Sequence, residues 1–173
     1  MTVDNLIVRY IDQAKEQNTY EEASQLRRKL ILDLHKLKHV EDEIRQSLET
    51  LIDDPCKLGA SLWLLAAKEN YSNVYLKSLL KMLSMPKECV WHEGILDILE
   101  IEPNEAMIPH LQDAVNHSLS NDPGKALAIR AMELLIDIDT DSAWEVIEQA
   151  SRMSTSDTIR EEAKEFIKEY RNK

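Results

Sequence analysis

The segment 137–148 carries the densest set of side chains that could hold a metal ion. Its sequence is DIDTDSAWEVIE, with carboxylates at positions 1, 3, 5, 9 and 12, which resembles the ligand spacing of a twelve-residue calcium-binding loop. Position six is Ser142, whereas the sharp turn of such a loop requires glycine. Ser142 and Glu145 also fit a capping box, in which two side chains start a helix. We therefore expect an inter-helix turn here and no bound metal.

Two groups of histidines have spacings that could supply part of a zinc site. His35 and His39 are four residues apart, and His110, Asp113 and His117 fall on one face of a predicted helix. A structural zinc site needs four ligands, and neither group is complete. The favoured interpretation is exposed helical histidines.

The sequence contains no pattern that identifies a reaction. Cys56 and Cys89 are the only cysteines, and cysteine packs well as a small apolar side chain. The chain has no phosphate-binding glycine loop, nucleophile elbow, HExxH or CxxC motif. We therefore expect a protein that is not an enzyme and that binds no cofactor.

Charge is distributed unevenly along the chain. Fourteen acidic residues but only two basic ones, Lys125 and Arg130, lie between Glu88 and Ala150. This stretch has a net charge of −12, whereas the whole protein has −11. A surface of one sign attracts partners of the opposite sign. Nucleic acid is excluded as the expected partner because binding to phosphates needs a basic surface.

Apolar residues recur every three or four positions almost throughout, which predicts an all-α protein. Only three glycines occur in 173 residues, and helices tolerate that scarcity better than turn-rich β folds. No signal peptide and no apolar run of about 18 residues is present, so we expect a cytoplasmic protein without a membrane partner. The expected helices lie near 3–17, 19–39, 41–53, 55–69, 71–84, 87–101, 104–119, 123–138, 141–153 and 157–171.

Several expected helix starts carry a capping signature. These are the capping boxes Thr19–Glu22, Ser142–Glu145 and Thr158–Glu161, and the N-cap and proline pairs Asp54-Pro55 and Asp122-Pro123.

The expected helices form pairs that repeat about every 34 residues. Pro55, Pro86 and Pro123 each start the first helix of a pair, at spacings of 31 and 37 residues. Second helices align at spacings of 32 and 36 residues, as in the set Leu79, Leu111 and Ile147. Such a period indicates stacked helix pairs, either of the tetratricopeptide or of the HEAT type.

Two segments resemble the first helix of a HEAT repeat. The sequence TIREEAKEFI, which contains Arg160 and Ala163, has the β-branched residue, arginine and alanine of that pattern, and AIRAMELL around Arg130 is similar except for Glu133. Units that start at Pro55 and Pro86 lack the arginine. The resemblance implies a short right-handed α-solenoid of about ten helices. It further implies one domain over residues 1–173, with N-terminal helices in 1–54, helix-pair repeats in 55–173 and a role as a binding scaffold.

The acidic residues cluster around two turns, which would adjoin in a stack of repeats. Exposed positions on the second helices also change from basic (Lys77 and Lys81) to acidic along the chain. We expect this surface to bind a partner through Glu100, Glu102, Glu105, Asp113, Asp137, Asp139, Asp141, Trp144, Glu145 and Glu148.

The tryptophans are expected to serve mainly as core residues. Trp63 and Trp91 lie on first helices, and Trp144 aligns with apolar positions of the other units. Packing is therefore favoured for Trp144, and an exposed aromatic anchor within an interface is the alternative.

In size, acidity and lack of catalytic motifs the chain is similar to bacterial immunity proteins. That similarity implies a cytosolic inhibitor that docks on the basic cleft of a nuclease toxin. Two alternatives stay open. One is an assembly adaptor or chaperone for a basic subunit, and the other is a HEAT-like DNA-processing enzyme such as a DNA glycosylase, which would need a basic groove.

Overall fold

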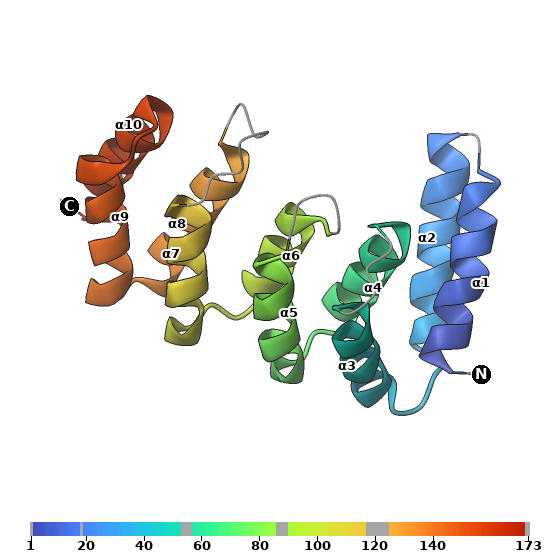
Figure 1. The fold of residues 1–173 in the computed structure, drawn as a ribbon. Coiled ribbons are helices and arrows are strands. Elements are labelled where there is room, and N and C mark those ends of the chain that lie inside the picture. Colours follow the sequence, from blue (N-terminus) through green and yellow to red (C-terminus); the bar gives the residue numbers. More distant parts are fainter. Residues whose placement is uncertain (1, 18, 53–56, 86–89, 117–124, 172–173) are drawn as a thin grey trace. The chain divides into compact units, whose positions relative to one another are not determined.

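The computed structural model describes residues 2–17, 19–52, 57–85, 90–116 and 125–171, which contain ten α-helices and no strand (Figure 1). The prediction of an all-α fold with about ten helices is confirmed. Within these residues no helix is both long and apolar enough to cross a membrane. The helices are α1 (Val3–Lys15), α2 (Tyr20–Leu34), α3 (Val40–Leu51), α4 (Lys57–Glu69), α5 (Leu76–Leu83), α6 (His92–Leu99), α7 (Ile108–Asn116), α8 (Ala126–Ile138), α9 (Asp141–Met153) and α10 (Asp157–Phe166).

Contacts between Cα atoms divide the chain into two compact units, Met1–Ile98 and Leu99–Lys173. In the first unit α1 packs on α2, α3 and α4, and α3 also packs on α5. In the second unit α8 packs on α7, α9 and α10, and α7 also packs on α9. Each unit buries its own apolar stripe, including Leu6, Tyr10 and Leu48 in the first and Leu111 and Ile147 in the second.

Helix pairs in the two units share local features at the predicted spacing. A 3₁₀ turn precedes both α5 (η1, Asn73–Tyr75) and α7 (η2, Glu105–Met107), and the polar caps Ser72 and Asn104 start these turns. The aligned residues Leu79, Leu111 and Ile147 are all fully buried. The 32-residue period therefore corresponds to equivalent local structure. The stacking of all pairs into one right-handed solenoid domain stays a prediction.

Several helix ends differ from the sequence-based prediction. The predicted helix 19–39 ends at Leu34, and the predicted helix 87–101 begins, within the described residues, at His92. The capping box of Thr19 and Glu22 is present. The markers at residues 54–55 and 122–123 lie outside the described residues.

The other two predicted capping boxes are wrong, because each helix begins at an earlier residue. The hydroxyl of Thr140 accepts a hydrogen bond from the Ala143 amide at 3.3 Å. The hydroxyl of Ser156 caps α10 in the same way, so Thr158 lies inside the helix. Thr140 and Ser156 have extended backbones, which is the conformation that an N-cap requires.

A partly buried hydrogen bond joins α1 to α2. The Tyr10 hydroxyl donates to Asp33 Oδ2 at 2.9 Å, and Lys36 Nζ lies 2.7 Å from the other oxygen. The bonds from Lys36 and then Tyr10 hold the pKa of Asp33 below its ordinary value. Burial, followed by the bond to Asp33, raises the pKa of Tyr10 to about 12.

The choice of N-cap in α9 can be tested with a matched pair of substitutions. Thr140→Ala removes the acceptor for the Ala143 amide and should lower the free energy of unfolding by about 1 kcal/mol. Ser142→Ala, two residues later and inside the helix, should change it by less than about 0.5 kcal/mol. Urea denaturation measures both, and equal losses would contradict the assignment.

The bond from Tyr10 to Asp33 makes stability depend on pH. Tyr10→Phe should lower the free energy of unfolding at neutral pH by about 1 kcal/mol. Because the folded-state pKa of Asp33 is lowered, its contribution is present above the unfolded-state pKa and is lost as pH falls through the folded-state value. The difference between the wild type and Tyr10→Phe should therefore shrink in acid. Denaturation curves at several pH values test this, and a constant difference would exclude it.

Candidate functional site

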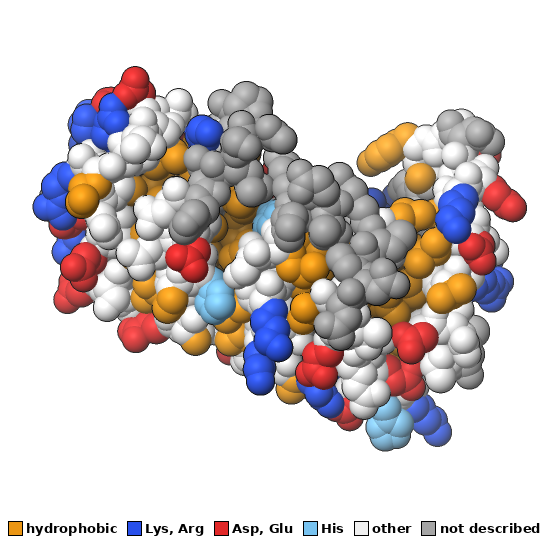
Figure 2. All heavy atoms as spheres, in the orientation of Figure 1, with side chains coloured by type: hydrophobic (Ala, Val, Ile, Leu, Met, Phe, Trp, Pro, Cys, Tyr) orange, Lys and Arg blue, Asp and Glu red, His pale blue; other side chains and the backbone are white. Residues whose placement is uncertain are grey.

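The second unit holds most of the protein's net negative charge. Residues 99–173 contain sixteen acidic and eight basic residues, a net charge of −8. Six of the eight basic residues follow Ala150, and five of these six lie in the last turn of α9, in α10 or in the π-helical turn Ile167–Arg171. In Figure 2 blue and red side chains accordingly lie together around α10. The α7 helix contains no Lys or Arg.

Both acidic turns lie at the end of the unit where α7 and α9 begin (Figure 1). Glu100, Glu102 and Glu105 surround the connection from α6 to α7, and Asp137, Asp139 and Asp141 surround the one from α8 to α9. Helices α7 and α9 pack together, and Gln112 Nε2 donates to Gln149 Oε1 at 3.3 Å between them. The fold thus brings the two acidic turns to the same end of this unit.

Arg130 partly neutralises the acidic turn between α6 and α7. Arg130 Nη2 lies 2.5 Å from Glu100 Oε1, and its Nη1 lies 2.8 Å from Glu133 Oε2. The hydrogen bond from Arg130 to Glu133, with the nearby charge of Glu100, raises the pKa of Arg130. Glu100 therefore contributes less to the negative surface than the sequence suggests.

A second arginine neutralises part of α9. The Arg171 guanidinium forms a charge-assisted hydrogen bond with Glu148, lies 3.8 Å from Asp141, and sits 5.7 Å from the centre of the Trp144 ring. Arg152 also reaches Glu148, at 3.3 Å. We call Asp141, Trp144 and Glu148 the Arg171 seat. The sequence carries no signal for this contact, because Arg171 is 23 residues from Glu148.

Trp144 is a packing residue. Its side chain is 6% exposed, and its indole N–H donates to Asp139 Oδ1 at 2.8 Å. Packing, the favoured interpretation, is confirmed, and an exposed aromatic anchor is excluded. Asp139 adopts a left-handed backbone with φ of 48°, so the bond to Trp144 holds the short link between α8 and α9.

The segment 137–148 does not form a calcium-binding loop. Its first two residues end α8, Asp139 and Thr140 form the link, and α9 begins at Asp141. A helical backbone after Asp141 cannot wrap around a cation. Within the part of the chain that the structure describes, no three His, Cys, Asp or Glu side chains are arranged to hold a metal ion.

Of the predicted carboxylates, Glu100 and Glu148 are partly buried, and the exposed Asp139 and Asp141 lie near Trp144 and Arg171. The other five are exposed, and we call them the α7–α9 acidic surface: Glu102, Glu105, Asp113, Asp137 and Glu145. Among them Glu105, Asp137 and Glu145 form no ion pair with any described residue. These three are the carboxylates most available to a partner.

Of the remaining predictions, one is confirmed, two are wrong, and some concern residues outside the described part. His35 caps the end of α2 and His39 precedes α3 with φ of 59°, so the prediction of one helix over 19–39 that contains both histidines is wrong. Trp63 is buried as expected, but Trp91, expected in the core, is 46% exposed. His117, Cys56 and Cys89 lie outside the described residues.

Comparisons of the chain with protein families, curated proteins and solved structures find no match. The function is therefore inferred from the geometry and charge of the site.

The Arg171 seat can be tested through its tryptophan. Arg171→Ala removes the cation from the Trp144 ring and should increase quenching of tryptophan fluorescence by acrylamide. The stability loss should stay below about 1 kcal/mol, because partly exposed ion pairs contribute little. Lys168→Ala is the control, since Lys168 is exposed in the same π-helical turn. Identical quenching in the two variants would contradict the assigned contact.

Proposed function

We propose that the second unit binds a basic protein partner through the α7–α9 acidic surface and catalyses no reaction. The observation that carries the proposal is the separation of charge in this unit. Its basic residues gather mainly at the C-terminal end of the chain, whereas the exposed charged residues of α7 and of both turns are all acidic. Like charges held together repel, and a basic partner would relieve that repulsion.

A nuclease toxin is the most concrete partner for such a surface. A nuclease needs a basic cleft to hold nucleic-acid phosphates, and an acidic protein can occupy that cleft. Electrostatic steering then speeds association, at a rate that falls as salt increases. Fast association suits an inhibitor that must act before its target reaches nucleic acid.

The contacts of Arg171 with its seat are of the same kind as those we propose between a partner's arginines and the acidic surface. An arginine of the chain itself is held by carboxylates and the face of an aromatic ring, and arginine binds carboxylates and stacks on aromatic rings better than lysine does. Glu105, Asp137 and Glu145 offer carboxylates of the same kind to arginines of a partner.

The test is a triple charge reversal, Glu105→Lys, Asp137→Lys and Glu145→Lys. Affinity purification from the source cells, followed by mass spectrometry, identifies the partner. Stopped-flow mixing with the purified partner should then show association slowed at least about tenfold at low salt. A nuclease assay with one equivalent of the protein should show inhibition by the wild type and weaker inhibition by the variant.

The control carries one reversal in the first unit, Glu69→Lys, at the exposed end of α4. It should associate at the wild-type rate. Association that is independent of salt, or unchanged by the triple reversal, would exclude the acidic surface. A basic partner that binds but has no nuclease activity would retain the surface and reject the inhibitor role in favour of an adaptor.

A further inference from the structure

Helix α4 in the first unit has two apolar faces, and the described residues fully cover only one of them. Trp63 and Ala67 are buried against the other helices. Leu58, Leu62 and Leu65, at spacings of four and three residues, form a second stripe that is partly exposed. A helix that is apolar on all sides is normally buried on all sides. Among the described residues of this unit, the second stripe of α4 is therefore only partly covered.

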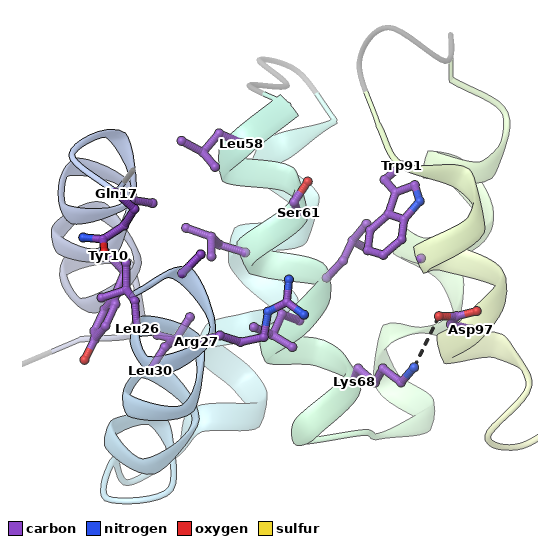
Figure 3. A pocket seen from close by; sticks show the side chains of 16 residues that line it. Tyr10, Gln17, Leu26, Arg27, Leu30, Leu58, Ser61, Lys68, Trp91 and Asp97 are labelled. Carbon is purple, nitrogen blue, oxygen red and sulfur yellow. Dashed lines mark hydrogen bonds and ion pairs between the residues drawn. The ribbon is translucent and has the colours of Figure 1, made fainter. Parts of the chain in front are cut away.

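This stripe is the floor of a groove of about 440 Å³ within the first unit (Figure 3). Helices α1 and α2 supply one wall, with Tyr10 and Leu30 at its deepest points, and α6 with Trp91 lies along the other side of α4. The Tyr10 ring lines the groove while its hydroxyl donates to Asp33. The volume falls in the range of small-molecule sites.

Trp91 is fixed at the rim of the groove. Its ring lies flat against Gly94, where an added Cβ would come within 2.6 Å of Trp91 Cε3. Its indole N–H donates to Glu93 Oε2 at 3.3 Å. The ring is nevertheless 46% exposed. A large aromatic side chain that is held in place yet open to solvent is typical of a binding surface.

Among the described residues that line the groove, one cation is available to a ligand. Arg27 extends from α2 over the groove toward α4 (Figure 3), and within the described residues it forms no ion pair. Lys68, the other cation of the lining, is 3.3 Å from Asp97 Oδ2. The charge of Arg27 is thus the one that a ligand can neutralise.

We propose that this groove binds a small amphiphile of the fatty-acid class, an apolar chain that ends in a carboxylate. The chain lies along Leu58, Leu62 and Leu65 and against the Trp91 ring. The carboxylate accepts hydrogen bonds from the Arg27 guanidinium, whose planar donors match its two oxygens. The site lies in the first unit and does not depend on the function proposed for the acidic surface.

The dimensions favour such a ligand over a partner helix. A helix with its side chains is about 10 Å wide, and it would bind an open surface rather than a cavity of 440 Å³. The deepest lining residues, Tyr10, Leu30 and Leu64, are almost fully buried, so the groove narrows toward its base and favours a narrow occupant. A single acyl chain meets that requirement.

The experiment is calorimetric titration with dodecanoate below its micellar concentration, with Trp fluorescence as a second readout. The wild type should bind one equivalent and change the emission of Trp91. Arg27→Gln should weaken binding about tenfold. Arg28→Gln, its exposed neighbour outside the groove, should bind as the wild type does. Dodecyltrimethylammonium, with the same chain and the opposite charge, should bind at least about tenfold more weakly than dodecanoate.

A second variant tests whether Trp91, at the rim of the groove, contributes to binding. Gly94→Ala displaces the Trp91 ring and should weaken dodecanoate binding at least about threefold, with circular dichroism confirming that the fold is retained. Absence of dodecanoate binding to the wild type would overturn the proposal. So would equal affinity for the two amphiphiles, or equal effects of Arg27→Gln and Arg28→Gln.

Discussion

Every helix of this protein depends on burying an apolar stripe against its neighbours. The helices are 8 to 15 residues long, and helices of that length are marginal in water on their own. Leu79, Leu111 and Ile147, which are completely buried, provide the contacts that local propensity does not. Caps such as Thr19 and Thr140 determine where a helix starts, but packing against neighbouring helices stabilises it.

Packing of the apolar stripes leaves the charged residues on the outside, where their arrangement differs between the units. In the second unit the fold gathers carboxylates from two separate turns at one end and then neutralises some of them. Arg130 forms ion pairs with Glu100 and Glu133, and Arg171 forms an ion pair with Glu148. What is left for a partner is a smaller surface on α7, α9 and the turns. Charge density along the sequence therefore overstates the charge density that a partner would meet.

In the first unit, the packing of the apolar stripes leaves an apolar surface exposed rather than a charged one. Helix α4 carries more apolar surface than its neighbours cover, and Trp91 stays at the surface, held flat on Gly94. The result is an apolar groove beside Arg27, which forms no ion pair with any residue that the structure describes. The two units thus present surfaces of different chemistry, one suited to a basic protein and the other to an apolar chain with an acidic end.

The sequence by itself determined the all-helical fold, the number of helices and the positions of the core, because a 3.6-residue apolar period and a scarcity of glycine leave few other solutions. It also placed the acidic stretch and the packing role of Trp144. Tertiary structure alone decided that Arg171 lies against Trp144, that Glu100 is paired, that His35 and His39 do not share a helix, and that Trp91 is exposed. These features depend on which residues distant in sequence meet in space, and on where a helix ends. Periodicity defines a helical face but does not specify what covers it.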